Sequence, residues 1–523
     1  LDADEKGVTV ATLDETGKIP LTQIPDGIGG GGTAEDITYD NAESGLVAED
    51  VQGAIDEVSS QLAETMNYLN DLGLNVLKNG AKGDGVTDDT LAIQSAVDYV
   101  ASRGGGAIYF PQTESYYKIT ESIKITTSNI SLLANGATIK CEGVFSGSGS
   151  QDLAAINIRN NNNQIENIKI KGFEIHGPQV GDGIEGYGIH VSWAKNVIVS
   201  ENNIYNCDDS GIRVDGYGGL WGDTSHTPRT NEGFTSYVSV ENNNIYNTTA
   251  GSGIELISYP THCSVVNNKI KGCQINGLRI AGAYMTTISN NIITDTLEGR
   301  SLYLAGRALT VTGNVIDNSI QSIGVYLNDL HDSIINNNTI QNSGLEAIFG
   351  ITTEDVNITI KKCIISNNTI KNWGTFGGSA WAIVIRGEGS DDNLIENNIV
   401  IAETSGERGI NVQELSGLPP EFNIIRNNLI KNLGSSVLIV NGTVLTGGSN
   451  QAITNIDLNT NRSPLNDTTK GKIFYADSYP TTGKWMKGDI VYKNTAVAGD
   501  YIGWVCISAT GSGTWKGFGL VEA

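Results

Sequence analysis

The chain has 523 residues, enough for several domains or one long repetitive one. Its 58 acidic residues outnumber its 33 Lys and Arg residues, and a formal net charge of −25 repels nucleic acid and anionic membranes. No apolar run approaches the roughly 20 residues of a membrane helix. The sequence has no P-loop, HExxH, GxSxG or calcium-loop pattern. We therefore expect no nucleic-acid partner, no membrane insertion, and no metal or other cofactor.

The N-terminal segment divides into a linker and a helix. The chain starts LDADEKGVTV, without Met or a basic stretch, so we expect no signal peptide and a trimmed start. Residues 1–45 are glycine-rich and are expected to form a linker. Within residues 46–72, one seam recurs at alternating four- and three-residue steps: Val51, Ile55, Val58, Leu62, Thr65 and Leu69. This spacing predicts a short helical stem of the coiled-coil or helix-bundle kind.

A second helix is predicted just before the repeats begin. In NGAKGDGVTDDTLAIQSAVDYV, residues 79–100, we expect Asp88 or Asp89 to cap the helix. Its predicted apolar face consists of Leu91, Ile93, Ala96, Val97 and Val100. Such a helix can cover the open end of a solenoid, where core residues and strand edges are otherwise exposed.

A short G-I-x-V element recurs along the middle of the chain. It begins at Gly188, Gly211, Gly253, Gly277, Ser301, Gly324, Ala347, Ala382 and Gly409, and most successive steps are 23 or 24 residues. Its two-residue alternation is typical of a strand with one buried face. Strands at a fixed spacing, with no helical pattern between them, predict an all-β fold, a right-handed parallel β-helix over residues 73–440.

Asparagine pairs mark one corner of each predicted coil. They are Asn202-Asn203, Asn267-Asn268, Asn290-Asn291, Asn337-Asn338, Asn367-Asn368, Asn397-Asn398 and Asn427-Asn428. Asparagine tolerates a left-handed backbone conformation, and its amide can bond to the coils above and below. We therefore expect these residues to stack on one another.

Four of the six cysteines also follow the repeat. Cys207 and Cys273 each lie three residues after a repeat isoleucine, and Cys263 and Cys363 each lie seven residues before one. Equivalent repeat positions predict buried free thiols rather than a disulfide or zinc framework.

The repeats fade after about residue 441. Residues 441–523 contain an aromatic-rich stretch with Trp485, Tyr492, Tyr501, Trp504 and Trp515. We expect a small C-terminal β module that serves trimerisation or carbohydrate binding.

These motifs together resemble known proteins. Residues 79–100 followed by Asn-rich coils resemble the pectate-lyase-like β-helix superfamily. LDETGKIPLTQIP and AEDITYDNAESGLVAEDVQGAIDEV look like the linking segments of phage tail fibres and tailspikes, and the last 50 residues resemble a C-terminal tailspike module. The resemblance implies a homotrimer in the virion, joined to the phage tail or baseplate through its N-terminal side. Such a protein is assembled in the host cytoplasm and binds, and usually degrades, a capsule or O-antigen at the host surface. It supplies no catalytic residues.

One outward-facing column of the predicted β-helix carries chemistry. With the branched residues of each G-I-x-V element in the core, the x positions point outward: His190, Arg213, Glu255, Arg279, Tyr303, Tyr326 and Phe349. Flat rings and charged donors suit a sugar chain, which favours a binding groove. A subunit interface, packing under a loop and a solvated face of paired charges are the alternatives. The insertion 215–237, with Tyr217 and Trp221, is predicted to wall the groove or merely to decorate the solenoid.

One carboxylate in this column and one beside it suggest glycoside hydrolysis. Asp215 and Glu255 lie one coil and two residues apart, on the order of 8 Å between Cα atoms, a spacing compatible with an inverting mechanism. We expect a solvated Glu255, kept ionised by Arg213 and Arg279, to act as base or nucleophile. Asp215 would be the acid if Trp221 or Tyr217 covers it. Rival carboxylates are Asp208, Asp209, Asp295, Glu298, Asp329 and Glu346.

Two other functions stay open at this point. A polysaccharide lyase needs a base beside a uronate carboxylate and cations to neutralise it, and Tyr303, His190, Arg213 and Arg279 are candidates for these roles. A non-catalytic receptor-binding adhesin needs only the groove. We predict His190, Arg213, Trp221, Arg279, Tyr303 and Tyr326 to bind the substrate.

Overall fold

The structure is a computed structural model in two compact units, residues 1–74 and 75–523, each described here by itself. Trp221 and Tyr217, which we expect to wall a groove, lie outside the described residues. The structure describes residues 34, 37–38, 40, 44–71, 73–143, 153–160, 162–178, 186–216, 235–351, 359–377, 380–387, 389–403, 407–413, 423–431, 438–440, 451–453, 456–457, 473–481, 485, 487–508 and 513–522.

The first unit contains helix α1 (Val51–Asp71), where the sequence predicts a helix. Asp50 precedes it, and its Oδ1 accepts a hydrogen bond from the Gly53 N–H at 2.7 Å, as an N-cap does. The seam residues Ile55, Val58 and Leu62 are 53%, 49% and 57% exposed. The helix is confirmed, whereas its role as a stem stays a prediction.

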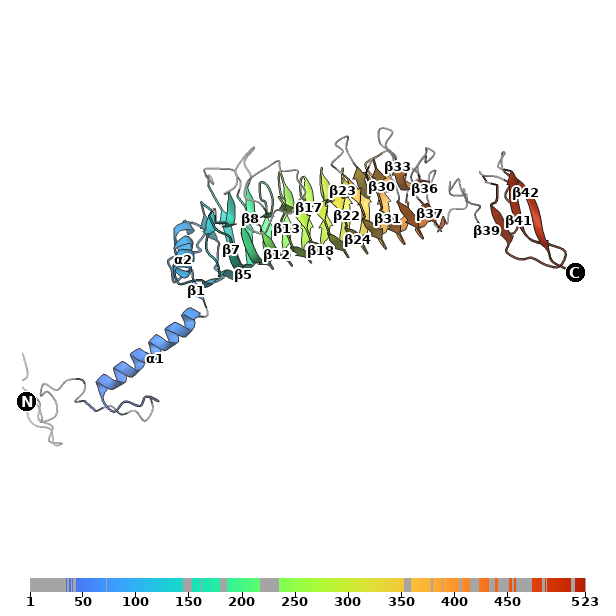
Figure 1. Ribbon diagram of the computed structural model, residues 1–523. Coiled ribbons are helices and arrows are strands. Elements are labelled where there is room, and N and C mark those ends of the chain that lie inside the picture. The colour runs from blue at the N-terminus through green and yellow to red at the C-terminus, as the bar shows by residue number, and fades with distance from the viewer. Residues whose placement is uncertain are drawn as a thin grey trace, which may run out of the picture. The chain divides into compact units, whose positions relative to one another are not determined.

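The second unit is a parallel β-solenoid of the right-handed type with about ten turns, built from three columns of strands (Figure 1). One column forms a 13-stranded sheet, here called the site sheet. Its strands are β4 (Ile123–Ile125), β6 (Ala154–Ile158), β8 (Tyr187–Ser192), β11 (Ile212–Asp215), β14 (Ser252–Ile257), β17 (Asn276–Tyr284), β20 (Arg300–Arg307), β23 (Ile323–His331), β26 (Ile348–Ile351), β27 (Ile360–Lys361), β30 (Trp381–Arg386), β33 (Arg408–Gln413) and β36 (Leu438–Val440).

The other two columns are continuous through the long strands β5 and β7. The first contains β1 (Leu74–Asn75), β2 (Gly106–Phe110), β5 (Ile130–Cys141), β7 (Ile165–His176), β9 (Ala194–Ser200), β12 (Ser236–Glu241), β15 (Ser264–Val266), β18 (Thr287–Ser289), β21 (Thr310–Thr312), β24 (Ile334–Asn336), β28 (Ile364–Ser366), β31 (Leu394–Glu396), β34 (Ile424–Arg426) and β37 (Gln451–Ile453). The second adds β3 (Tyr117–Ile119), β10 (Asn203–Tyr205), β13 (Asn244–Tyr246), β16 (Lys269–Lys271), β19 (Ile292–Thr294), β22 (Val315–Ser319), β25 (Thr339–Ser343), β29 (Thr369–Trp373), β32 (Ile399–Ile401), β35 (Leu429–Lys431) and β38 (Ile456–Asp457). Because β37 and β38 still pair with β34 and β35, the ladder continues past residue 440, where we predict its end.

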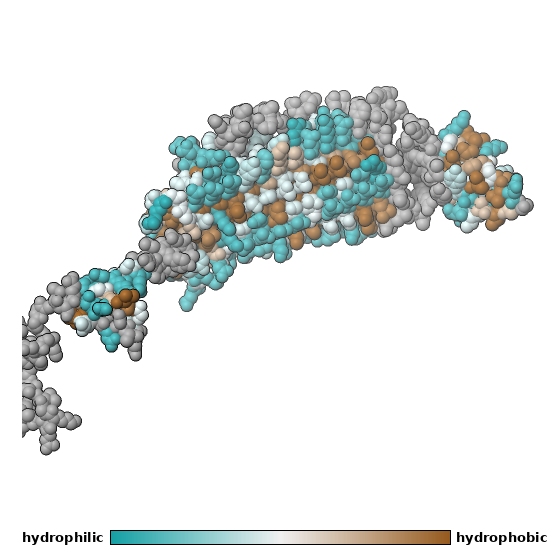
Figure 2. Space-filling view, turned by 60° about the horizontal axis from the view of Figure 1, so that its bottom comes forward, coloured by the Kyte–Doolittle hydropathy of each residue, from teal (hydrophilic) through white to brown (hydrophobic). Residues whose placement is uncertain are grey.

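The core consists of identical or similar residues stacked from coil to coil. In the site sheet Ile212 pairs with Ile189 on one side and Ile254 on the other, and Ile254 pairs with Leu278. All four are fully buried. The predicted phase of the G-I-x-V element is therefore confirmed, because its branched residues form the core. Figure 2 shows hydrophobic residues in patches among hydrophilic ones on the solenoid surface.

A hydrogen-bonded asparagine ladder runs along one corner. In each coil Oδ1 of the ladder residue accepts from both the backbone N–H and Nδ2 of the preceding ladder residue, at 2.9–3.0 Å. The ladder residues are Asn202, Asn243, Asn268, Asn291, Asn314, Asn338, Asn368, Asn398 and Asn428, all 0–1% exposed. The residue before each one turns the chain in a left-handed conformation, as Asn290 does at φ 55°. The stacked corner that the Asn pairs predict is thus confirmed.

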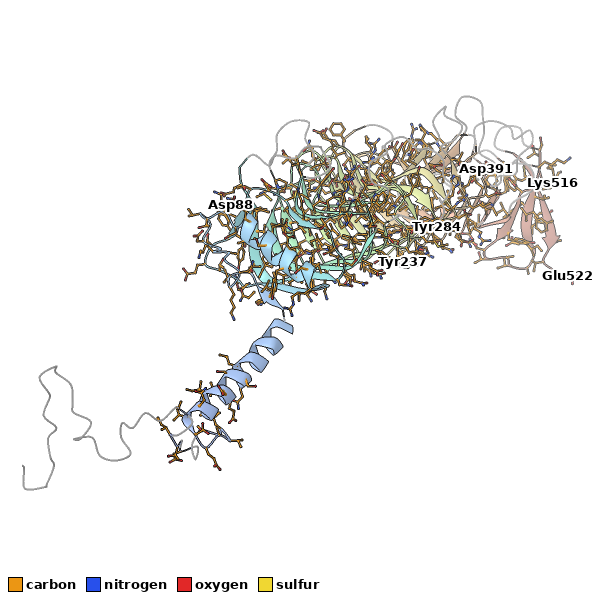
Figure 3. All side chains as sticks on the ribbon, turned by 60° about the vertical axis from the view of Figure 1, so that its left-hand side comes forward. Asp88, Tyr237, Tyr284, Asp391, Lys516 and Glu522 are labelled. Carbon is orange, nitrogen blue, oxygen red and sulfur yellow. The ribbon has the colours of Figure 1, made fainter. Side chains whose placement is uncertain are left out.

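Helix α2 (Thr90–Ser102) covers one end of the solenoid and packs against β2, β4 and β5 (Figure 1). Its buried residues are Thr90, Ile93, Ala96, Val97 and Val100, whereas Leu91 is 80% exposed. The prediction for Leu91 is wrong because two residues turn a helix by about 200°, which places Leu91 opposite Ile93. Asp88, labelled at this end in Figure 3, accepts a hydrogen bond from the Thr90 N–H at 3.0 Å.

The C-terminal part of the described chain forms a four-stranded sheet. Its strands are β39 (Ile473–Ala476), β40 (Ile490–Lys493), β41 (Tyr501–Ser508) and β42 (Thr514–Leu520). Trp485 and Trp515 meet edge to face at 5.0 Å, so an aromatic β module is present as expected.

All six cysteines are buried and free, which confirms the thiol prediction. Among the described helices, none has the length and hydropathy to cross a membrane.

Candidate functional site

The predicted outward column exists as a ladder on the site sheet. Arg213 pairs with Glu255, Glu255 with Arg279, and Arg279 with Tyr303 in successive strands. The ladder continues through Tyr326 to Phe349. Because side chains alternate along a strand and Ile254 and Leu256 lie in the core, Glu255 points away from it.

Part of this ladder lines a pocket of about 330 Å³. The pocket is lined by Asp209, Arg213, Ala250, Gly251, Ser252, Glu255, Ile275, Asn276, Arg279, Arg300 and Tyr303. Four predicted site residues therefore come together: Arg213, Glu255, Arg279 and Tyr303. Asp209 packs closely against the backbone of Gly251. A larger residue would not fit there, since a β-carbon at position 251 would lie 2.1 Å from Oδ1 of Asp209.

Glu255 is held by three neighbours. Its Oε1 accepts from the Ser252 hydroxyl at 2.8 Å and from Nη1 of Arg279 at 3.4 Å, and its Oε2 lies 3.8 Å from Nη1 of Arg213. Ser252 in turn accepts a hydrogen bond from Nδ2 of Asn276 at 3.1 Å. The carboxylate is thus fixed by one hydroxyl and two guanidinium groups.

The expectation that Glu255 is solvated is wrong. Its side chain is 6% exposed, and that of Arg213 is 4% exposed. The sequence places an arginine directly on each side of Glu255 in the ladder, and buried charges persist in proteins when they are paired and hydrogen-bonded in this way. Facing away from the core therefore does not make these side chains solvent-exposed.

Asp215 lies beside this pocket rather than in its lining. Its Oδ2 is 3.5 Å from Nη2 of Arg213, so one arginine contacts both predicted catalytic carboxylates. His190 is also buried, at 2% exposure, and its ring lies 5.4 Å from that of Tyr187. His190, like Asp215, is outside the residues that line the pocket.

An aromatic row extends from the pocket along the site sheet. The rings of Tyr303 and Tyr326 lie 5.4 Å apart, and those of Tyr326 and Phe349 lie 5.9 Å apart. Arg279 lies over Tyr303 and Arg300 over Tyr326, at 5.7 and 4.8 Å from the ring centroids. Burial raises the pKa of Tyr303 above its ordinary value, although the nearby Arg279 acts in the opposite direction. Tyr303 is therefore a protonated phenol near neutral pH.

Sequence reasoning missed three polar residues of the pocket. Ser252, Asn276 and Arg300 occupy matching positions in consecutive strands, three residues before the Glu255, Arg279 and Tyr303 positions. The signal was available, because the repeat that aligns Glu255 with Arg279 and Tyr303 also aligns these three residues. Of the rival carboxylates, Asp209 lines the pocket, and Asp208, Asp295, Glu298, Asp329 and Glu346 do not. Within the described ranges, no three His, Cys, Asp or Glu residues are grouped to hold a metal.

Part of the solenoid that lines this pocket is similar to known proteins. Residues 73–279 match the family model described as rhamnogalacturonase A/epimerase, pectate lyase-like. This match covers less than half of the chain. Residues 222–380 also match the model described as periplasmic copper-binding protein (NosD). The stretch 73–279 contains Asp209, Glu255 and Arg279, while Arg300 and Tyr303 lie beyond it.

Individual relatives extend this likeness. The pre-neck appendage protein of Bacillus phage phi29 is 26% identical over 306 residues, covering 51% of this chain and 32% of that protein. The structure of phi29 gene product 12 covers 82% of this chain and 62% of its own, with a TM-score of 0.51 at 17% identity. The A-module of the Azotobacter vinelandii mannuronan C-5 epimerase AlgE4 covers 72% of this chain and all of its own, with a TM-score of 0.51 at 14% identity. Both structural likenesses concern the fold. The chain spans 32–57% of the length of the curated relatives that it matches over long stretches.

Proposed function

We propose that this chain belongs to a phage tailspike that binds a bacterial surface polysaccharide, a capsule or an O-antigen, and depolymerises it by glycosidic hydrolysis. The observation that carries the proposal is the pocket that Glu255 and Asp209 line together with three arginines, beside a row of neighbouring aromatic rings. Carboxylates supply acid–base chemistry, and flat rings bind the apolar faces of sugars. The pectate-lyase-like match and the phage appendage relative support this choice.

In the proposed reaction Glu255 is the base. It removes a proton from a water molecule whose oxygen bonds to the anomeric carbon, while a second carboxyl group protonates the departing glycosidic oxygen. One C–O bond forms as one breaks. Asp215 is the acid predicted from strand register, and Asp209 is the alternative that the pocket favours, since it shares the lining with Glu255.

The test is incubation of the protein with purified polysaccharides from candidate host bacteria. New reducing ends without absorbance near 235 nm, where an unsaturated uronate absorbs, support hydrolysis. Asp209→Asn and Asp215→Asn then identify the acid, because only loss of the acid should slow cleavage by orders of magnitude. Binding without new reducing ends would replace the enzyme proposal with that of an adhesin.

A lyase is the second candidate, and the arginines are the observation that favours it. Arg213, Arg279 and Arg300 line one pocket, and cations there would neutralise a uronate carboxylate in the transition state. The raised pKa of Tyr303 suits a proton donor better than a base, which weighs against Tyr303 in the base role. Reducing ends that appear together with absorbance near 235 nm would support this reading.

We further propose that three copies associate in a virion. The seam of α1 supports self-association, because Ile55, Val58 and Leu62 are about half exposed. A trimer would carry a formal charge of 3 × −25 = −75, which favours solubility. The phi29 relative supports a place in a phage tail, reached through the N-terminal side. Sedimentation at micromolar concentration tests the trimer, and labelling of phage particles with an antibody to this chain tests its location.

A further inference from the structure

We infer that the pocket receives a sugar that carries a carboxylate, and that Arg300 binds this carboxylate. The inference rests on the proposed function and names its substrate class. The three arginines of the pocket differ in their ion-pair partners. Arg213 lies within 4 Å of both Asp215 and Glu255, and Arg279 also pairs with Glu255. Arg300 forms no ion pair with any described residue, so its charge is available to a ligand.

Arg300 is also held in an orientation that suits carboxylate binding. It begins β20, directly beside Asn276 of β17, and its guanidinium lies 4.8 Å from the ring centroid of Tyr326. Contact with an aromatic face occupies one face of the planar guanidinium and leaves the N–H groups at its edge free. No described side chain accepts a hydrogen bond from those groups. Two parallel N–H donors match the two oxygens of a carboxylate.

The surroundings indicate that the carboxylate belongs to a sugar ring. Tyr303 lines the same pocket, and its ring lies 5.4 Å from that of Tyr326, so a flat apolar surface adjoins Arg300. Ser252, Asn276 and Asp209 add polar groups that can bond to hydroxyls. The volume of about 330 Å³ lies in the small-molecule range. Since Glu255 lines this pocket too, the acidic sugar would sit at or next to the bond that is cleaved.

Matched sugars and matched arginines test the inference. The probes are D-glucuronate and D-galacturonate, each compared with D-glucose and D-galactose, with affinity measured by ligand-observed NMR titration on the full chain. The control variant is Arg307→Gln, because Arg307 lies on the same strand but pairs with Asp332 at 3.1 Å outside the pocket. We expect the wild type and Arg307→Gln to prefer at least one uronate about tenfold over its neutral counterpart, as a charge-assisted bond provides. Arg300→Gln should lose this preference.

Salt and a conservative variant sharpen the result. Raising NaCl from 20 to 300 mM should reduce the preference, because the charge of a half-buried arginine is screened. Arg300→Lys keeps the charge and should keep part of the preference, which also serves if Arg300→Gln does not fold. Equal binding of uronates and neutral sugars by the wild type would overturn the inference. A preference that survives in Arg300→Gln, or in Arg300→Lys with no reduction, would also overturn it.

This inference and the proposed function can fail separately. If the protein depolymerises a surface polysaccharide but shows no uronate preference, the function stands and the acidic-sugar inference falls. If it binds uronate through Arg300 but cleaves none of the host polysaccharides, the inference stands and the enzyme proposal falls.

Discussion

The asparagine ladder and the outward ladder of Arg213, Glu255, Arg279 and Tyr303, here called the pocket ladder, come from the same repeat. Only the asparagine ladder keeps one residue type from coil to coil. Along the corner, the same residue type recurs from Asn202 to Asn428, and each amide satisfies the next. Along the site sheet, the outward residue changes from Arg213 to Glu255, Arg279 and Tyr303 within four strands. Repetition therefore serves stability in this fold, and the points where repetition stops carry the candidate chemistry.

The largest expected effect comes from Glu255→Gln, which changes the pocket ladder alone. The substitution removes the charge at nearly constant shape, so we expect kcat to fall by about 10³-fold or more while polysaccharide binding survives. Reducing-end assays and binding measurements on the same preparation check this. The Tm should also fall, because the substitution removes the negative charge between Arg213 and Arg279, so kcat is referred to the folded fraction. Wild-type cleavage by Glu255→Gln, together with a loss of cleavage in a change at Glu298, Asp329 or Glu346, would place the active groove elsewhere on the coil.

Asn291→Ala, which changes the asparagine ladder alone, is expected to reduce stability and to leave catalysis unchanged. Oδ1 of Asn291 accepts two hydrogen bonds from Asn268, and its Nδ2 donates to Asn314 and to the Val265 carbonyl. Losing them leaves buried partners unsatisfied, so we expect a destabilisation of about 2–4 kcal/mol. The drop in Tm measures it, and catalysis by the folded fraction should be unchanged.

Asn290→Gly is the matched control for this substitution. Asn290 has a φ of 55°, and the equivalent position in the next coil is already a glycine, Gly313 at φ 68°. Glycine adopts this conformation without strain, so the Tm should stay within a few degrees of the wild-type value. If Asn290→Gly destabilises as much as Asn291→Ala, the stacked amides are not what distinguishes the ladder position.

The buried thiols make the stability of the repetitive core depend on alkaline pH. Burial raises the pKa of Cys263 and Cys363 to about 12 and that of Cys273 to about 11. An unfolded chain ionises its thiols near their ordinary pKa, so it binds fewer protons than the folded chain above about pH 9. Stability is therefore fully present below that pH and is lost as pH rises toward 11–12.

Thermal melts between pH 8 and 11 measure this loss. Cys273→Ala should flatten the alkaline decline, since one of the shifted thiols is gone. Reaction of the native protein with a thiol reagent at pH 8 should be slow at all six cysteines, because each is buried. Rapid labelling of Cys263 or Cys363 would contradict the burial on which this prediction depends.

Most of the fold could be predicted from the sequence because the same motif recurs in coil after coil. The inward Ile of each G-I-x-V element and the stacked amides both follow from repeat positions, and both are confirmed. Leu91 shows that an apolar residue need not belong to the apolar face of its helix. Its angular position around the helix decides whether it is buried, and Leu91 is exposed.

The pocket was predictable only in part. Register brought Arg213, Glu255 and Arg279 together correctly, because neighbouring coils place equivalent residues side by side. Burial was not predictable in the same way, since it depends on what covers the outward face, and that differs from coil to coil. Ser252 and Arg300 were missed because they lie at strand starts, outside the G-I-x-V letters that define the repeat.

The smallest expected effects concern Tyr303, where the pocket meets the aromatic row. Tyr303→Ala removes a ring that adjoins Tyr326, so we expect polysaccharide binding to weaken by about tenfold, in the range of one aromatic contact, with a smaller change in kcat. Tyr303→Phe keeps the ring and loses only the hydroxyl, which accepts a hydrogen bond from Nδ2 of Asn328 at 2.7 Å. Binding by Tyr303→Phe should therefore stay within about threefold of the wild type, as the loss of one partly exposed hydrogen bond predicts. If Tyr303→Phe instead abolishes cleavage while binding persists, the protonated phenol takes part in the chemistry, as a proton donor would, and the row is not merely a platform for sugar rings.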